Sequence, residues 1–341
     1  MQKNKIILSA IFLVIFIIFG FWAAQKFRTP ESVTIGPENV SQMENQEPKN
    51  TTPHPYSLPA LMTKNFRGEK LMLGEVLKKE DAYTQYYITY MSEGFKISGV
   101  LNVPNGAGPF PVIISNHGFI EPAYYKNGQG LKREEDFFAR HGYVVLHSDY
   151  RNHAQSDTDP ENDTKPRTGY TEDAVNAILA VKNSGLPYID PEKIFMLGHS
   201  MGGGIALNVM VVQPDLVKAF VLLAPINADY KKNFDRWVAP EMSDIAKDTI
   251  AEFGTYEENP ELWESFSAKN YFANIQTPIM LHQGTEDKDV PLAWSQELNE
   301  NLKKAGKDIT YFEYPGEGHT FYAAQDQVMQ RSLEFFDRYA K

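Results

Sequence analysis

From residue 83 to the C-terminus, short apolar runs alternate with longer amphipathic stretches, and this pattern predicts an α/β domain. Residues 83–91 and 95–103, separated by Ser92-Glu93-Gly94, are typical of an antiparallel hairpin. The later apolar runs are short and continuous, as in strands that are buried on both faces. This succession predicts a mainly parallel, eight-stranded sheet with helices on both faces.

The predicted strands are residues 83–91, 95–103, 112–116, 143–147, 194–197, 219–223, 279–282 and 309–314. The predicted helices are residues 132–141, 171–183, a segment directly after residue 200, 292–305 and 325–339. Thr171, followed by two acidic residues, is the expected N-terminal cap of the second helix.

A long insertion, about residues 227–276, separates the strands predicted at residues 219–223 and 279–282. Most connections in compact domains are only a few residues long, so this segment is expected to form a helical lid. For any single aromatic residue in it, a role in a small side core is as reasonable as a substrate contact, so we assign none to the substrate. The aromatic residues considered are Phe234, Trp237, Phe253, Tyr256, Trp263, Phe266, Tyr271 and Phe272.

The N-terminal part of the chain has a different pattern. Residues 6–24 carry no charge and approach the roughly 20 residues that a helix needs to cross a bilayer. We expect residues 1–28 to form an uncleaved, single-pass transmembrane helix with the folded body outside the cytoplasm. Secretion after signal cleavage is the alternative, but the apolar core is long for a signal peptide and Trp22 occupies a position that normally holds a small residue.

Residues 29–60 are rich in Pro, Glu, Asn, Ser and Thr and contain almost no apolar run. Such a composition cannot offset the entropy of ordering, so we expect a disordered tether. Residues 61–341 then form the folded domain, because 42% hydrophobic residues in a chain of 341 suffice for a large core.

The composition excludes several classes of function. A formal net charge of -11 without a clustered basic stripe argues against binding of nucleic acid. The chain has no cysteine, which excludes disulfides, thiolate metal sites and a cysteine nucleophile. The histidines lack the spacing of metal ligands, so we expect neither a metal nor a cofactor. The sequence leaves the oligomeric state open.

One short segment carries a candidate nucleophile. The apolar residues 194–197 lead into Gly198-His199-Ser200-Met201-Gly202, and a helical pattern with two further glycines follows. Gly-x-Ser-x-Gly between a strand and a helix is typical of the nucleophile elbow, in which a strained turn exposes the serine hydroxyl. Ser200 is therefore the predicted nucleophile.

A serine nucleophile needs a histidine to take its proton and a carboxylate to orient that histidine. Of the two histidines after Ser200, His282 lies within a predicted strand, whereas His319 lies in a glycine-rich loop and is the predicted base. The loop after residue 282 offers three carboxylates. We choose Asp287 over Asp289, which is better placed to cap the next helix, with Glu286 third.

The oxyanion of the tetrahedral intermediate needs hydrogen-bond donors, and this architecture supplies two backbone N–H groups. They are expected from Phe119, in the turn after the strand at residues 112–116, and from Met201. His117 and His199 are interpreted as structural. The polar segment Ser148-Asp149-Tyr150-Arg151, followed by Ser156, is attractive as a substrate site, but we favour a structural ion pair that stiffens its loop.

These residues resemble the catalytic domain of the prolyl oligopeptidase family, an α/β-hydrolase group of serine peptidases with esterase-like relatives. The similarity covers about residues 83–339 and includes FKISGVLNVPNGAGPFPVIISNHG, GYVVLHSDYR and YIDPEKIFMLGHSMGGG. Residues 258–322, from ENPELW to GEGHTFY, are its most specific part. The resemblance implies the α/β-hydrolase fold with Ser200 as nucleophile, Asp287 as acid and His319 as base.

The sequence departs from that family in three ways. Its oxyanion turn is His117-Gly118-Phe119, where peptidase members often have a second glycine and a proline. Residues 149–156, DYRNHAQS, lack the glycines common there. About 60 residues of anchor and tether cannot build the propeller of the peptidases. An ester is therefore kept beside a peptide as a substrate.

The sequence predicts a serine hydrolase that cleaves a short peptide or a small acyl ester through an acyl-enzyme at Ser200. A carboxylesterase of the feruloyl-esterase type is the alternative within this class. A catalytically silent α/β-hydrolase module used for binding is the alternative from another class.

Overall fold

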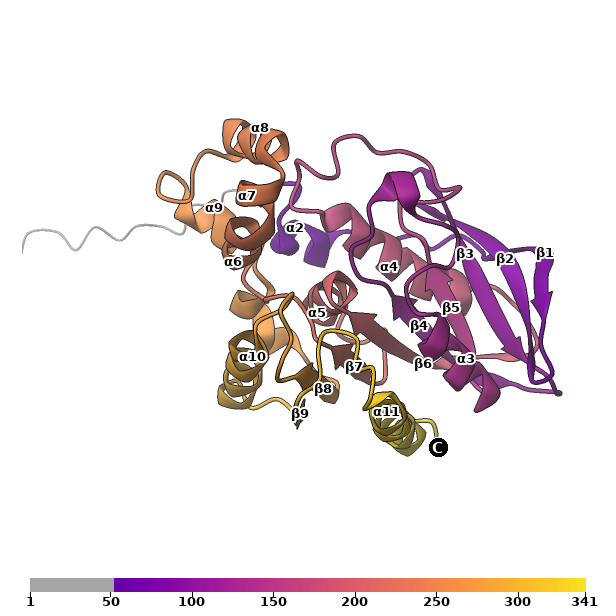
Figure 1. Ribbon diagram of the computed structural model, residues 1–341. Helices are drawn as coiled ribbons and strands as arrows, with labels where there is room; N and C mark the ends of the chain where they lie inside the picture. Colours follow the sequence, from indigo (N-terminus) through magenta and orange to yellow (C-terminus); the bar gives the residue numbers. More distant parts are fainter. Residues whose placement is uncertain (1–51) are drawn as a thin grey trace, which may run out of the picture. The chain divides into compact units, whose positions relative to one another are not determined.

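The computed structural model describes residues 52–341, which form a nine-stranded mixed sheet with helices on both faces (Figure 1). The strand order is β1-β2-β3-β5-β4-β6-β7-β8-β9. The pairs from β5 to β9 are parallel, whereas β1, β2 and β3 run antiparallel to their neighbours. The sheet is therefore mainly parallel, with an antiparallel edge.

Most predicted strands and helices agree with the structure within a few residues. The strands are β1 (Met72–Lys79), β2 (Tyr83–Ser92), β3 (Phe95–Pro104), β4 (Phe110–Asn116), β5 (Val144–Ser148), β6 (Ile189–His199), β7 (Phe220–Leu223), β8 (Ile279–Gly284) and β9 (Ile309–Tyr314). The main helices are α2 (Leu58–Thr63), α3 (Lys132–Arg140), α4 (Thr168–Lys182), α5 (Met201–Val212), α10 (Leu292–Lys304) and α11 (Gln325–Tyr339), with the short η1 (Pro122–Tyr124) before α3.

Two apolar cores lie on opposite faces of the sheet. Side chains of α2, α4, α5 and α10 pack on one face, together with Ile114, Met196 and Leu222 of the central strands. Side chains of α3 and α11 pack on the other face, where Phe138 and Phe336 lie 5.8 Å apart between ring centroids. Burial on both faces explains why the central strands are continuous apolar runs in the sequence.

The prediction of eight strands is wrong, because β1 adds a ninth at the antiparallel edge. All eight residues of β1 are exposed, so the strand has no alternation of apolar and polar positions that the sequence could show. The cap predicted at Thr171 is also wrong. Helix α4 begins at Thr168, one turn earlier, and it follows Arg167, whose φ of 52° is left-handed.

The transmembrane helix in the predicted fold is corrected as well. Among residues 52–341, no helix combines the length and the apolar composition needed to span a bilayer. The predicted span at residues 6–24 lies outside the described residues, as do residues 1–28 and most of the tether predicted at residues 29–60. Helix α2 begins within the last three residues assigned to that tether, and its Leu58 and Leu61 are buried against the first core.

The insertion between β7 and β8 is helical. It consists of α6 (Tyr230–Asn233), η2 (Phe234–Val238), α7 (Ala239–Glu241), α8 (Ser243–Phe253), α9 (Pro260–Glu264) and η3 (Ala268–Asn274). Phe234, Ala246 and Trp263 form a small core of its own, and the rings of Phe234 and Trp263 meet edge to face at 4.9 Å. The insertion is therefore a packed subdomain rather than an open loop.

Candidate active site

Ser200 lies in the tight turn between β6 and α5, with φ 55° and ψ -119°. The positive φ is strained for a residue with a side chain. The Ser200 N–H donates to the Leu223 carbonyl of the neighbouring strand at 3.0 Å, which holds the turn in place. A Cβ atom at position 202 would collide with the Asn116 carbonyl, so only glycine permits this close approach of helix and sheet. The turn has the geometry expected for a nucleophile elbow.

Asp287 and His319 meet at the same edge of the sheet, in the loops after the adjacent parallel strands β8 and β9. His319 Nδ1 lies 2.8 Å from Asp287 Oδ2. The other carboxylate oxygen accepts the backbone N–H groups of Asp289 and Val290, each at 2.9 Å. Gln283 Nε2 donates to Oδ2 at 2.9 Å. The carboxylate is thus fixed from several sides and aimed at the imidazole.

The electrostatics favour a charged Asp287. Burial of its carboxylate would raise the pKa, but the hydrogen bonds from His319, Val290 and Gln283 outweigh burial, and the pKa lies below its usual value. Asp289, the alternative acid, is exposed and makes no hydrogen bond to His319 among the described residues. Asp287, Asp289 and His319 offer ligand atoms within 4.8 Å of one another, but Asp287 already accepts four hydrogen bonds there.

Ser200 and His319 line the same cavity. Within residues 52–341, no hydrogen bond joins the Ser200 hydroxyl to the His319 ring. Catalytic hydrogen bonds of this kind are often long before substrate binds and tighten in the complex. The three side chains therefore have the chain order and the common edge that a serine triad requires, with one contact still open.

His199 supports the loop of His319. Its Nε2 donates to the His319 carbonyl at 2.9 Å, and the two rings lie 4.5 Å apart between centroids. Burial, assisted by the neighbouring His319, lowers the pKa of His199 to about 4, so the ring is neutral and has one N–H to donate. This contact is consistent with the structural interpretation of His199.

The two residues predicted to supply oxyanion donors, Phe119 and Met201, line the same cavity as Ser200. Their backbone N–H groups donate to no acceptor within the described part of the chain. Gly118, between His117 and Phe119, approaches Ser200 so closely that a Cβ atom there would lie 3.1 Å from the Ser200 Cβ. The turn after β4 therefore lies against the start of α5, and the binding of an oxyanion by these two N–H groups stays a prediction.

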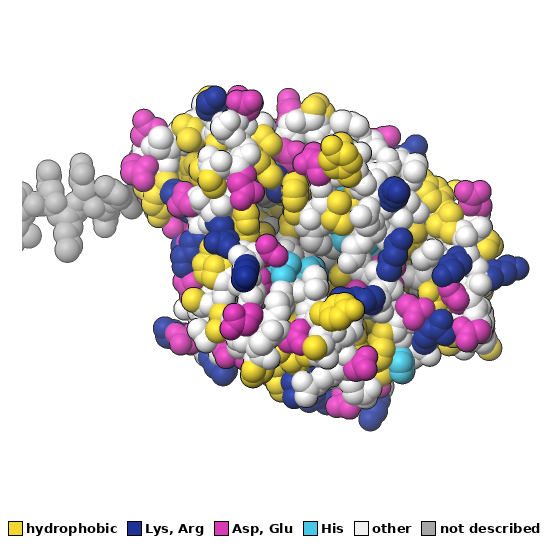
Figure 2. All heavy atoms as spheres, viewed as in Figure 1, with side chains coloured by type: hydrophobic (Ala, Val, Ile, Leu, Met, Phe, Trp, Pro, Cys, Tyr) yellow, Lys and Arg dark blue, Asp and Glu magenta, His cyan; other side chains and the backbone are white. Residues whose placement is uncertain are grey.

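The cavity next to Ser200 measures about 470 Å³. One wall comes from the insertion and includes Tyr230, Phe234, Trp237 and Phe266. Histidine side chains are visible in a hollow near the middle of the face in Figure 2, with hydrophobic side chains gathered beside it. The insertion therefore contributes directly to the surface that a substrate would contact, as a lid does.

Arg167 is a cavity residue that the sequence analysis missed. Its guanidinium lies over the Phe119 ring at 5.2 Å and donates to Asp163 at 3.0 Å. Gln283, which fixes Asp287, was missed as well. Neither residue belongs to a motif, and each reaches the site only through the folded arrangement of the loops, so no local signal in the sequence marked them.

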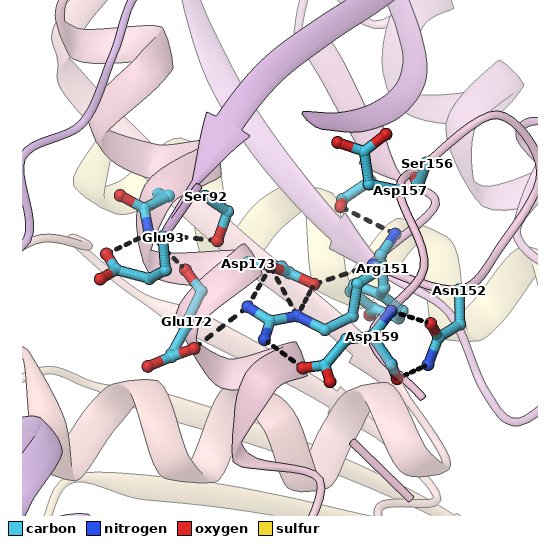
Figure 3. A network of polar contacts seen from close by, with 12 residues as sticks. Ser92, Glu93, Arg151, Asn152, Ser156, Asp157, Asp159, Glu172 and Asp173 are labelled. Atoms are coloured by element: carbon cyan, nitrogen blue, oxygen red, sulfur yellow. Dashed lines mark hydrogen bonds and ion pairs between the residues drawn. The ribbon is translucent and has the colours of Figure 1, made fainter. Parts of the chain in front are cut away.

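Arg151 forms the structural ion pair that was expected, and its partners lie on α4 and in the loop that precedes α4 (Figure 3). The guanidinium donates to Asp173, Glu172 and Asp159 at 2.8–3.2 Å, and the backbone N–H of Arg151 also donates to Asp173. These residues do not line the cavity. The network joins the loop after β5 to α4 and so restricts the motion of that loop.

Comparison with known proteins identifies the family. A family model described as "Prolyl oligopeptidase family" matches residues 129–341. "Uncharacterized peptidase YuxL" of Bacillus subtilis is 27% identical over 243 residues, which cover 68% of this chain and 35% of that protein. The chain thus spans only about a third of this relative, and similarly 36% of dipeptidyl peptidase 4 from Porphyromonas gingivalis.

Two solved structures share the fold across most of the described residues. Acylaminoacyl peptidase of Pyrococcus horikoshii has a TM-score of 0.62 and 22% identity, covering 77% of this chain and 43% of that chain. Acetyl xylan esterase from Paenibacillus sp. R4 has a TM-score of 0.63 and 18% identity, covering 83% and 92%. The sequence match and the sheet architecture agree. The chain therefore belongs to the prolyl oligopeptidase family.

Proposed function

We propose that Ser200, His319 and Asp287 form a catalytic triad that hydrolyses a carboxylic ester or a short peptide through an acyl-enzyme. The observation that carries this proposal is the Asp287–His319 hydrogen bond of 2.8 Å, directed from two adjacent loops toward the cavity that Ser200 lines. The other carboxylate–histidine ion pair among the described residues, Glu135–His147, does not line that cavity.

In the first half of the reaction, His319 Nε2 takes the proton of the Ser200 hydroxyl as its oxygen attacks the substrate carbonyl carbon. The carbonyl oxygen becomes an oxyanion, which the N–H groups of Phe119 and Met201 bind. His319 then gives the proton to the leaving alcohol or amine, and the bond to that group breaks. Asp287, negatively charged throughout, stabilises the imidazolium in between.

In the second half, a water molecule replaces the leaving group. His319 takes a proton from the water, whose oxygen attacks the acyl carbon, and a second oxyanion forms in the same hole. The Ser200 oxygen leaves and regains its proton from His319, and the acid product is released. No further reactant is needed, because water supplies both the new C–O bond and the proton that Ser200 recovers.

The acyl group that fits this site is larger than acetyl and mainly apolar. A cavity of about 470 Å³ with the aromatic wall of Tyr230, Phe234, Trp237 and Phe266 favours such a group through burial of apolar surface. Both peptidases and an acetyl xylan esterase share the fold, so the leaving group is left to experiment. A series of p-nitrophenyl acyl esters and aminoacyl-naphthylamides, assayed in parallel, separates an esterase from a peptidase.

A fluorophosphonate probe tests the proposed nucleophile directly. The wild-type protein should be labelled covalently, and Ser200→Ala should not. Labelling of Ser200→Ala at the wild-type rate, or no labelling of folded wild-type protein, contradicts the proposal. The second outcome would favour the silent binding module, because that alternative keeps the fold without the chemistry.

A further inference from the structure

The turn that carries Phe119 rests on two buried imidazoles. His117 Nδ1 lies 2.7 Å from the Gly118 carbonyl oxygen, and His153 Nε2 lies 3.2 Å from the Ile120 carbonyl oxygen. Both rings are fully buried. The Gly118 carbonyl directly precedes the Phe119 N–H in the chain, whereas the Ile120 carbonyl comes one residue after Phe119.

The two carbonyls differ in what they are bonded to. The Gly118 carbonyl and the Phe119 N–H belong to one planar peptide group, in which C=O and N–H point in opposite directions. A donor fixed on the Gly118 oxygen therefore also fixes the direction of the Phe119 N–H. It polarises the same amide, which makes that N–H a stronger donor. The Ile120 carbonyl belongs to the next-but-one peptide group and has no such link.

The His117 ring must be protonated on Nδ1 for this contact to be a hydrogen bond. Both ring nitrogens face carbonyl oxygens, Gly118 at 2.7 Å from Nδ1 and Asp149 at 3.4 Å from Nε2. Burial holds the pKa of His117 well below its usual value, so the ring is neutral and carries a single proton. The shorter contact identifies Nδ1 as the protonated nitrogen, since two acceptors at 2.7 Å would repel each other.

Aromatic neighbours prevent the His117 ring from turning away. It stacks on Tyr150 at 4.4 Å and on Tyr125 at 4.7 Å between centroids. Tyr125 is itself fixed, because its hydroxyl donates to Asp149 at 2.9 Å and meets His147 Nε2 at 2.9 Å. His147 is held in turn by Glu135. The ring thus belongs to a rigid stack directly beneath the turn.

We propose that His117 is the positioning residue of the oxyanion hole: its Nδ1–H holds the Gly118–Phe119 peptide so that the Phe119 N–H points at the oxyanion. The inference rests on the proposed function, and it assigns to His117 a role beyond filling the core. A His117 that only fills space would be replaceable by a side chain of similar bulk, whereas a positioning His117 requires a donor.

Three variants separate these roles. His117→Leu removes the donor, and His117→Asn returns a donor close to the position of Nδ1. His153→Leu is the matched control, because it removes a buried imidazole that packs edge-on against His117 at 5.4 Å but makes its own hydrogen bond to the Ile120 carbonyl, not to the Gly118–Phe119 peptide. We expect His117→Leu to lower kcat about 10–100-fold with KM changed less than about 3-fold, since a misaligned donor weakens binding of the transition state alone. His117→Asn should recover most of kcat, and His153→Leu should stay within about 3-fold of wild type.

The same variants are read with the fluorophosphonate probe. The rate of labelling should fall in His117→Leu and recover in His117→Asn. If the wild type is not labelled, the proposed function fails and the role of His117 is overturned with it. If the wild type is labelled but His117→Leu reacts at the wild-type rate, or if His153→Leu loses as much as His117→Leu, only the positioning role is overturned.

A measurement on the wild-type protein covers the case in which His117→Leu does not fold. In protein labelled with ¹⁵N-histidine, the nitrogen shifts distinguish the protonated from the unprotonated ring nitrogen. The inference requires a neutral His117 with its proton on Nδ1. A proton on Nε2 would leave two acceptors facing each other at the Gly118 carbonyl, and this result overturns the proposal without any substitution.

Discussion

Asp287 and Asp173 are two buried carboxylates with nearly the same surroundings and different partners. Each side chain is fully buried, and each accepts hydrogen bonds from backbone and side-chain donors. Asp173 faces the guanidinium of Arg151, of which only 4% is exposed. Asp287 faces the imidazole of His319, of which 15% is exposed at the cavity.

The difference lies in what the partner can do. A guanidinium is charged at every accessible pH and has no proton to exchange, so the Arg151–Asp173 pair can only hold its loop on α4. An imidazole gains and loses a proton near neutral pH, and a carboxylate fixed on one side leaves its other nitrogen free to act. Burial and hydrogen bonding of an acid therefore do not distinguish a structural site from a catalytic one, and a titratable partner at a cavity is the feature that the proposed triad adds.

The largest effect is expected from Asp287→Asn. The amide can still accept the N–H groups of Asp289 and Val290, but it presents its own N–H₂ to His319 Nδ1. His319 must then carry its proton on Nε2, where it cannot accept the proton of Ser200. We expect kcat to fall about 10⁴-fold, as measured by ester hydrolysis, with little change in the thermal midpoint.

Asp289→Asn is the matched control for that variant, because Asp289 is exposed in the same loop. It should keep activity within a few-fold of wild type. If activity were retained in Asp287→Asn but lost in Asp289→Asn, the acid of the triad would be Asp289. The comparison of Asp287 with Asp173 would then no longer separate a catalytic carboxylate from a structural one.

The positions of the three proposed triad residues were largely predictable from the sequence. Ser200 follows a short apolar strand and precedes glycines, so a local motif is enough to indicate its turn. Asp287 and His319 follow neighbouring strands of a parallel sheet, and their meeting follows from chain order and topology. Their catalytic roles stay predictions until they are tested.

The ion-pair network of Arg151 was predictable from the sequence only in outline. An ion pair at Arg151 was expected, but its partner Asp173 lies 22 residues along the chain on α4. The choice among several nearby acids depends on how α4 packs on the sheet, which no local pattern encodes. The same holds for the His117 ring, whose role depends on one peptide group 2.7 Å away.

A second prediction applies the same chemical change to the other carboxylate. Asp173→Asn removes one negative charge from a guanidinium that stays buried, so the free energy of unfolding should fall by about 3 kcal/mol. Arg151 still donates to Glu172 and Asp159, and these contacts limit the decrease in the free energy of unfolding. Urea unfolding gives the stability, and kcat per folded molecule should stay within a few-fold of wild type.

A strong effect of Asp173→Asn on kcat would contradict a purely structural role of the Arg151–Asp173 pair. Were Asp173→Asn to lower kcat as strongly as Asp287→Asn at a temperature where both are folded, the loop after β5 would have to transmit strain to the site. The Arg151–Asp173 pair could then no longer be called purely structural, in contrast to the His319–Asp287 pair.

The smallest effect is expected at the outer end of the Arg151 network. Lys64, at the end of α2, pairs with Glu93 at 2.8 Å and with Glu172, which Arg151 also contacts. Its side chain is 31% exposed, so water screens the pair and Lys64→Gln should cost less than about 1 kcal/mol of stability by urea unfolding. Activity should not change. A loss close to that of Asp173→Asn would mean that α2, Glu172 and Arg151 unfold as one unit. The buried network would then extend to a helix whose first half was predicted to belong to the tether.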